Sequence, residues 1–408
     1  MKFSIKRRKL HIYTYFLALY FFLAPMEDLL TGTFGTLAKY IAILFVAAGL
    51  IESRGRFTLS KKTENILIIL LTAVGMMSLL WSIDLETTLK RLPAYMLLPG
   101  YCVFASLLDF EEEDYAFISK AAVLGALLTV GYLFFTGRLS TTGRVTIADS
   151  SDPNNFAALL LLPLALCFQQ RKSEKKAFIV LYSAIAILLL FCMLFTGSRG
   201  GLLSIAIVAI AFLLLTRANK KILYMAVLGL IILIVWFYVL PRLPERIRWR
   251  LFDSESYMLS EAREESRTGI WRNVFTYILP NMKLWGIGAG CSSLALSSVY
   301  GHLRGVHNTY LNMVCEYGVF GIGFFIAFLI VLITKLKARA RYLELSCLIG
   351  MCFLIFFLDS YQKKFFWNVI LIVYLAIKIT PVQKQGQVEH SLAADEDAFT
   401  YNYSFKGN

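Results

Sequence analysis

The chain has 408 residues, of which 58% are hydrophobic and only 17% are charged. Soluble domains are about 45–50% apolar and about 25% charged, so this composition excludes a soluble enzyme, a disordered chain and a nucleic-acid-binding domain. The formal net charge of +14 is therefore not a nucleic-acid footprint. In a membrane protein, a basic excess orients loops and attracts anionic lipid.

Apolar runs suited to crossing a bilayer recur along the whole chain. A spanning helix needs about 20 mainly apolar residues, and its backbone groups cannot stay unpaired in lipid, so these runs are predicted to be helices. Twelve runs qualify, several of them short: 11–25, 34–51, 65–81, 92–108, 116–135, 155–170, 177–196, 200–216, 221–240, 306–333, 343–359 and 364–380. The predicted fold is an all-α polytopic membrane protein with about 12 transmembrane helices. One transmembrane domain covers residues 1–380, and a disordered cytoplasmic tail covers 381–408.

Lysine and arginine predict the orientation of the spans. With the N-terminus inside, the short basic segments 53–62, 171–176, 217–221 and 334–341 all face the cytoplasm. This distribution predicts a multi-pass protein of the cytoplasmic (inner) membrane with both termini cytoplasmic. The acidic segment 109–115 fits this orientation less well, although acidic residues carry little weight in the rule.

One long extracytoplasmic loop, residues 241–305, is predicted between the ninth and tenth helices. It contains eight arginines and one lysine, whereas the inside segments favour lysine. Arginine presents a planar fork that matches phosphate and carboxylate, so the loop suggests an anionic ligand at the outer face. The alternative is that these arginines pair with the six acidic residues of the same loop.

The segment from Thr196 to Gly201 reads TGSRGG and joins two long apolar helices. Its glycines permit a tight reversal and the close approach of a ligand to the backbone. Arg199 stands in this outer turn with no acidic residue near it in sequence. It is either a ligand-binding arginine or an interfacial anchor that contacts lipid headgroups.

Arg267 and Trp271 lie in the second half of the long loop. In a helix, residues four apart share one face, so a cation and an aromatic ring are presented together. This pair suits a diphosphate and a sugar ring, and it equally suits a structural cation–π contact. Arg272 competes with Arg267 for the same role, and Arg304 is a further candidate for substrate binding.

His307 stands where the long loop enters the tenth predicted span. Asn308, Asn312 and Glu316 follow at intervals of four residues and form one polar stripe on a continuous helix. With a rise of 1.5 Å per residue, Glu316 lies about 13 Å below His307. Ionisable groups at such depth mark a functional site or a hydrogen-bond cluster between packed helices.

Together these residues predict a glycosyl transfer. Histidine is suited to take a proton near neutral pH, and two or three guanidinium groups bind and stabilise a departing diphosphate. The seven cysteines contain no CxxC pair, which supports neither a disulfide framework nor a zinc site. We expect no metal and no cofactor, and the glycine-rich run at 286–290 follows no strand, which disfavours a nucleotide cradle.

The pattern resembles the O-antigen ligases and Wzy-type O-antigen polymerases, which share a membrane domain. The resemblance rests on TGSRGG at 196–201, LWGIGAG at 284–290, HNTYLNMVCEYGVFG at 307–321 and SDPNNFA at 151–157. Arg267 and Trp271, the number of spans and the large outer loop complete it.

The resemblance implies a GT-C-like, metal-independent, inverting glycosyltransferase that acts at the outer face of the cytoplasmic membrane. By this resemblance Arg199, Arg267 and His307 match the family's catalytic residues, which bind the undecaprenyl diphosphate of a lipid-linked glycan and activate the acceptor. The acceptor is either a lipid A core, as in a ligase, or a second lipid-linked glycan, as in a polymerase. Asp152 and Asn154 either contact substrate or cap the sixth helix.

Two other classes remain open at this point. A twelve-span transporter or flippase of lipid-linked glycan predicts two similar halves, and no internal repeat is visible. A glycosyltransferase that uses dolichol-phosphate sugars predicts acidic residues in the first outer loop. Glu27 and Asp28 lie there, but that loop has only about nine residues.

Overall fold

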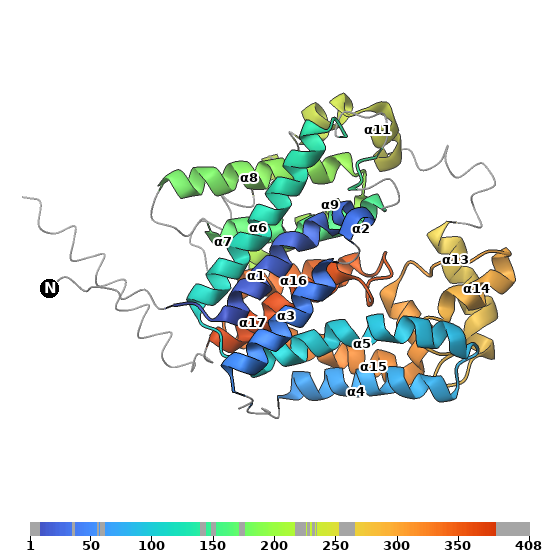
Figure 1. The fold of residues 1–408 in the computed structure, drawn as a ribbon. Helices are drawn as coiled ribbons and strands as arrows, with labels where there is room; N and C mark the ends of the chain where they lie inside the picture. The colour runs from blue at the N-terminus through green and yellow to red at the C-terminus, as the bar shows by residue number, and fades with distance from the viewer. Residues whose placement is uncertain are drawn as a thin grey trace, which may run out of the picture.

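The computed structural model describes residues 9–34, 37–54, 57, 62–138, 144–147, 152–170, 176–216, 226, 229–230, 233, 235–252 and 266–380. Every regular element in these residues is a helix, which confirms the all-α prediction (Figure 1). The predicted tail, 381–408, and half of the ninth predicted span, 221–240, lie outside the described residues.

The first helices pack into one group. The helix α1 (Ile12–Leu23) continues through η1 (Ala24–Met26) into α2 (Glu27–Phe34), and α3 (Leu37–Glu52) follows. The helix α1 packs against α3 and α6 (Glu112–Phe135). A Cβ at Gly125 would overlap the carbonyl oxygen of Phe22, so glycine at this position allows α6 to approach α1 closely.

A second group contains α4 (Thr63–Met77), which ends in η2 (Ser78–Leu80), α5 (Leu85–Leu107) and α15 (Thr309–Ala338). These three helices lie side by side in Figure 1. The carboxylate of Asp84 caps α5 by accepting a hydrogen bond from the backbone N–H of Glu86.

The helix α17 (Lys364–Ile379) lies at the centre of the molecule and packs against α5, α7 and α16. The remaining long helices are α7 (Pro153–Gln170), α8 (Lys176–Phe195), α9 (Arg199–Leu215) and α16 (Tyr342–Leu354). Every residue of α17 from Phe365 to Ile377 is buried, so this helix forms the middle of the core. A helix that is apolar on all sides is expected at such a position.

The predicted long loop is largely helical in the described residues. The helix η3 (Val235–Val239) precedes the loop, and η4 (Leu240–Arg242) leads into it. The loop itself contains α11 (Glu245–Phe252), α13 (Arg267–Asn273), η5 (Val274–Ile278), η6 (Leu279–Asn281) and α14 (Ser292–Tyr300). Residues 253–265 lie outside the described residues. The second half of the loop has its own small core, which includes Ile270, Val274, Cys291 and Leu296. Cys291, which lies in a polar stretch of the sequence, is therefore buried. None of the seven described cysteines forms a disulfide.

The prediction of one continuous helix over 306–333 is wrong. The helix α15 begins at Thr309 and is broken at Gly318, where φ is 64° and ψ is −157°. Residues 284–288 fill the break: Ile287 N–H donates to Cys315 O at 2.9 Å, and Gly288 N–H donates to Glu316 O at 3.1 Å. Backbone groups released by the break thus find partners, as a buried polar backbone requires.

Residues predicted to lie on the inner side gather at one end of the molecule. Ion pairs there join Glu64 to Lys335, Asp109 to Lys378 at 3.5 Å and Glu112 to Arg341 at 3.1 Å. These pairs explain why an acidic segment is tolerated among basic ones: its carboxylates neutralise the lysines and arginines of neighbouring helix ends.

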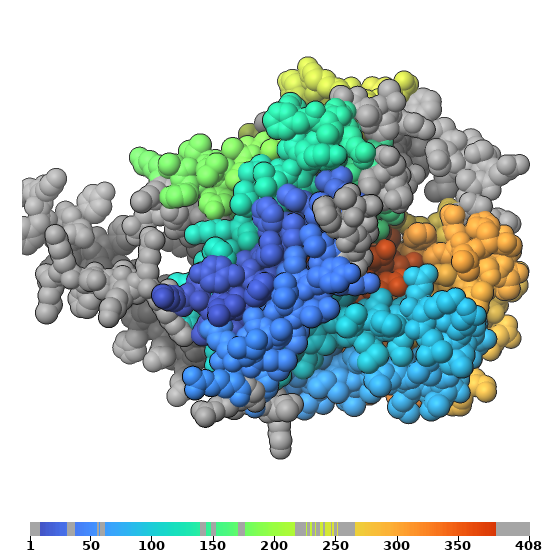
Figure 2. All heavy atoms as spheres, in the orientation of Figure 1, coloured from blue at the N-terminus to red at the C-terminus, as the bar shows by residue number. Residues whose placement is uncertain are grey.

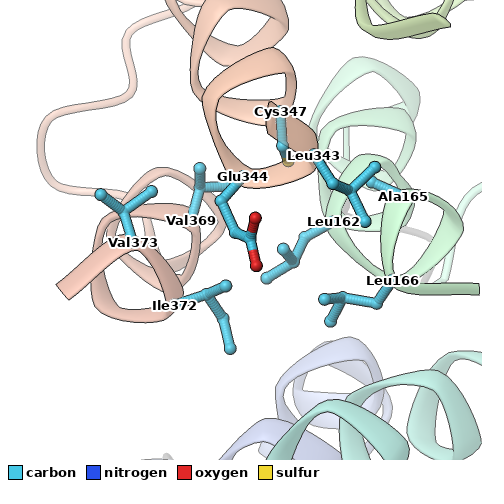
Figure 3. A pocket seen from close by; sticks show the side chains of 9 residues that line it. All are labelled: Leu162, Ala165, Leu166, Leu343, Glu344, Cys347, Val369, Ile372 and Val373. Carbon is cyan, nitrogen blue, oxygen red and sulfur yellow. The ribbon is translucent and has the colours of Figure 1, made fainter. Parts of the chain in front are cut away.

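Glu344 lies at the same end and points into a small cavity between α16, α17 and α7 (Figure 3). The hydroxyl of Tyr115 donates a hydrogen bond of 2.8 Å to its carboxylate, and Arg341 lies 3.5 Å away. The guanidinium of Arg341 also covers the ring of Tyr115 at 5.0 Å. These contacts compensate a carboxylate that is otherwise surrounded by aliphatic side chains.

Four described helical segments are long and apolar enough to cross a membrane. They are 63–80, 112–135, 176–195 and 309–338, and three shorter apolar helices accompany them. The number of twelve spans and the sidedness of the termini stay predictions.

Candidate active site

Residues 355–363 form the segment between α16 and α17 and join the elements that carry the predicted site. They lie at the opposite end of the molecule from the ion pairs of Glu64, Asp109 and Glu112. In Figure 2 a small orange-red patch is visible at the surface between α5 and the region of α14, although most residues of the segment are buried or half-buried. A Cβ at Gly200 would contact the side chain of Phe357 at 4.0 Å, and the guanidinium carbon of Arg267 lies 5.9 Å from the centre of the same ring. The start of α9 and the helix α13 therefore both approach one aromatic residue, Phe357.

His307 adopts a left-handed backbone conformation with φ of 54°. Such a conformation is uncommon outside glycine and is maintained only where the surroundings stabilise it. Asp359 provides this stabilisation, because its carboxylate accepts hydrogen bonds from the N–H of His307 at 2.9 Å and of Asn308 at 3.2 Å. Gly305 is required beside it, since an added Cβ would lie 2.7 Å from the Asp359 carboxylate.

Thr309 fastens this arrangement to α16 and to the segment that follows it. Its N–H donates to Ile355 O at 2.9 Å, and its hydroxyl donates to Leu358 O at 2.6 Å. The same hydroxyl accepts a hydrogen bond from the N–H of Ser360 at 2.8 Å. The position of Asp359 is thus determined from both sides.

The charges around His307 oppose one another. Burial lowers the pKa of the imidazole below its ordinary value, and the positive charges of Arg267 and Arg304 lower it further, whereas Asp359 and Asp152 raise it. The net direction is downward, so the neutral imidazole predominates at neutral pH. A neutral imidazole is the form that accepts a proton.

The helix α13 confirms the predicted helical spacing of Arg267 and Trp271. Ser266 caps it by accepting a hydrogen bond from Gly269 N–H. The half-buried Arg267 is among the charges that act on His307, whereas Arg272 is exposed to solvent and is not among them. The structure therefore brings Arg267, rather than Arg272, to the histidine.

Trp271 has a structural position beside this site. Its indole N–H donates to Val306 O at 3.0 Å, and its ring packs against Phe356 and Phe357 with centroid distances of 5.3 and 6.4 Å. These contacts hold Trp271 next to His307, and its indole N–H is already used in a hydrogen bond to the backbone.

Arg199 is the first residue of α9 and is exposed. The hydroxyl of Ser198 caps the helix, and Gly197 has φ of 60°, which is the turn conformation that glycine favours. A Cβ at Gly201 would lie 2.8 Å from the Cβ of Ala157, so α9 begins in close contact with α7.

The start of α7 confirms the capping interpretation of Asp152. Its carboxylate accepts hydrogen bonds from the N–H of Asn154 at 2.8 Å and from the side-chain amide of Asn154 at 2.9 Å. The carbonyl oxygen of that amide accepts a hydrogen bond of 3.0 Å from Arg144. Since Asp152 also acts electrostatically on His307, the capping residue lies close to the histidine as well.

The predicted polar stripe occupies packing positions rather than one open face. Asn308 caps α15 by accepting a hydrogen bond from Leu311 N–H at 3.0 Å, and Asn312 is buried. Glu316 is 1% exposed and accepts hydrogen bonds of 2.7 Å from both Tyr95 and Ser292. Its carboxylate thus fastens α5 and the start of α14 to the broken helix.

Two residues of this region were not singled out by the sequence. Asp359 is an ionisable residue at the last position of a predicted span, which is a usable signal. Arg144 stands in the loop between α6 and α7 among small polar residues, and nothing in its sequence neighbourhood distinguishes it.

Residues 184–326 match the family model described as O-antigen ligase. This segment of the chain is therefore similar to the O-antigen ligases. The matched segment contains Arg199, Arg267 and His307, and it excludes Arg144 and Asp359. No curated protein matches the chain.

Glu27, the candidate that a different glycosyltransferase class required, forms an ion pair with Lys364 at the start of α17. This ion pair gives Glu27 a role in the packing of two helices.

Proposed function

We propose that the protein is a membrane glycosyltransferase of the O-antigen ligase or polymerase type. It transfers a glycan from an undecaprenyl-diphosphate-linked donor to a sugar hydroxyl at the outer face of the cytoplasmic membrane. The observation that carries the proposal is His307, a largely neutral imidazole beside the positive charges of Arg267 and Arg304. The family match over 184–326 supports the same class of enzyme.

In this mechanism Arg199 and Arg267 bind the diphosphate of the donor, and Arg304 adds positive charge. Guanidinium groups form bidentate, charge-assisted hydrogen bonds with phosphate oxygens. His307 removes the proton from the acceptor hydroxyl as its oxygen attacks the anomeric carbon. The bond from that carbon to the diphosphate oxygen breaks, and the lipid diphosphate leaves with the electron pair, stabilised by the arginines.

The acceptor is the second part of the proposal. A lipid A core would make the enzyme a ligase in lipopolysaccharide biosynthesis, and a second lipid-linked glycan would make it a polysaccharide polymerase. Both reactions use the same donor chemistry and the same base. The product distinguishes them, because only a polymerase elongates a donor that is supplied alone.

The test is turnover by the purified protein in lipid nanodiscs, with lipid-linked glycan extracted from the source strain. Arg199→Ala, Arg267→Ala and His307→Ala should each lose most of the turnover at matched protein amounts, and about 10²–10⁴-fold is expected for a general base. Arg248→Ala is the matched control, since Arg248 is exposed on α11. Full turnover in any of the three variants would contradict the assigned role.

Metal independence is tested in the same assay. Turnover should be unchanged after EDTA treatment and desalting, and a loss that Mg²⁺ or Mn²⁺ restores would refute this part of the mechanism.

The proposed topology places both termini in the cytoplasm and the 241–305 loop outside. With the native cysteines replaced, a cysteine at Glu255 should react with an impermeant maleimide in whole cells. A cysteine at Lys62 should react only after the membrane is permeabilised. The reverse pattern would invert the proposed orientation.

A further inference from the structure

A short segment of the loop between α6 and α7, residues 144–147, is attached to the site region. The side chains of Val145 and Ile147 are each 1% exposed and anchor the segment in the core. The N–H of Val145 donates to Phe195 O at 3.1 Å, and Arg138 donates to Ile147 O at 3.1 Å. The segment is therefore part of the packed structure at the end of α8.

Arg144 uses one edge of its guanidinium to join two other elements. Its Nε donates to Thr196 O at 2.8 Å, and its Nη2 donates to the amide oxygen of Asn154 at 3.0 Å. The first acceptor belongs to the glycine turn that precedes Arg199, and the second belongs to the first turn of α7. A planar guanidinium holds two such acceptors at a defined separation, whereas the donors of an ammonium group have no fixed planar arrangement.

The glycine turn is buried, and it already packs against α7. Thr196 and Ser198 are 0% and 2% exposed, and a Cβ at Gly201 would lie 2.8 Å from the Cβ of Ala157. Within the turn, Thr196 accepts a hydrogen bond from Ser198 N–H at 3.2 Å, but this bond does not connect the turn to α7. Arg144 adds hydrogen bonds to both the turn and α7, which fix the direction of this packing contact.

The connection continues toward the histidine. The amide nitrogen of Asn154 donates to Asp152 at 2.9 Å, and Asp152 is one of the charges that act on His307. Arg144 thus lies where the turn of Arg199 and the acidic cap beside His307 are joined.

We propose that Arg144 is a positioning residue of the donor site. It fixes the glycine turn to the start of α7, and by doing so it holds Arg199 at the distance from His307 that a bound diphosphate requires. The inference rests on the proposed function for the role of Arg199, whereas the attachment of the turn is testable without any substrate.

The first experiment measures the attachment directly. Hydrogen–deuterium exchange of the full-length protein in nanodiscs is followed in peptides covering residues 193–202. Arg144→Ala should increase exchange there at least severalfold, and Arg144→Lys should give an intermediate result. Arg138→Ala is the matched control, because Arg138 contacts the same segment through Ile147 O and should leave these peptides near the wild-type rate. Unchanged exchange in Arg144→Ala would overturn the proposal.

The second experiment measures coupling to Arg199, with undecaprenyl diphosphate as the probe in nanodiscs. Arg144→Ala should weaken its binding on the order of tenfold, as expected when hydrogen bonds that orient a charged group are lost. In the Arg199→Ala background the same change should weaken binding by no more than about twofold, because the two residues act as one unit. An equal loss in both backgrounds would show independent action and refute the positioning role.

The two experiments separate this inference from the proposed function. If the wild-type protein does not bind undecaprenyl diphosphate, the proposed donor is wrong. The exchange result still decides whether Arg144 holds the turn.

Discussion

Asp359 offers the sharpest test of how this site is built. The residue accepts two hydrogen bonds, from the N–H groups of His307 and Asn308 at 2.9 and 3.2 Å. Hydrogen bonds to a charged group contribute about 1.5–3 kcal/mol each. A left-handed conformation at a residue other than glycine costs of order 1–3 kcal/mol, and His307 adopts one.

Asp359→Ala removes both hydrogen bonds and leaves this strain uncompensated. The productive position of His307 then becomes unfavourable by about 1–3 kcal/mol, which corresponds to a loss of turnover of roughly 5- to 150-fold. Asp359→Asn keeps one acceptor oxygen, so its loss should be smaller, on the order of several-fold.

The pH profile provides a second readout for Asp359→Asn. The negative charge of Asp359 raises the pKa of His307, so its removal should lower that pKa further. A base is active when neutral, and the acid limb of kcat/KM should therefore move to lower pH. The assay is turnover between pH 5 and 9 with purified protein. Ser360→Ala is the control, because the Ser360 hydroxyl has no hydrogen-bond partner among the described residues. Wild-type turnover in Asp359→Ala, or an acid limb that moves to higher pH in Asp359→Asn, would refute this reasoning.

Three further outcomes are expected. Arg267→Gln removes a positive charge that lowers the pKa of His307, so the acid limb of the variant's residual turnover should move to higher pH. An unmoved acid limb would show that the charge of Arg267 does not act on His307. Glu316→Gln keeps most of its hydrogen bonds and should retain much of the turnover, whereas Glu316→Leu should lower the yield of folded protein measured by size-exclusion chromatography. Gly318→Ala would place a Cβ onto the carbonyl oxygen of Leu284 at a left-handed position and should lower the melting temperature. Gly323→Ala, which meets nothing within 4 Å, should not lower it, and equal melting temperatures would contradict the role of the break.

Local sequence was sufficient for the class of fold. Long apolar runs in a lipid-compatible chain leave few alternatives to helices, because every backbone polar group needs an internal partner. The capping role of Asp152 and the shared helix of Arg267 and Trp271 were equally local, since each depends on neighbours within one turn.

Local sequence failed at the tenth predicted span. Its apolar pattern predicts one helix, yet α15 is broken at Gly318 and receives the segment 284–288. A break of this kind becomes favourable only when a distant segment supplies partners for the released backbone groups. The same event accounts for Gly286, where an added Cβ would overlap the backbone of Cys315 and Glu316, whereas at Gly288 and Gly290 it would meet Ser82 and Arg91.

What the sequence by itself determined is the all-helical, membrane-type chain and the set of residues suited to phosphate and proton transfer, because composition and residue chemistry decide both. What only the tertiary structure decided is which of these residues meet. It selected Arg267 over Arg272 beside His307 and added Asp359 and Arg144, which are 52 and 163 positions away in the chain. Such contacts join helix ends that are far apart in sequence, and their positions depend on packing around α17 rather than on any periodic pattern.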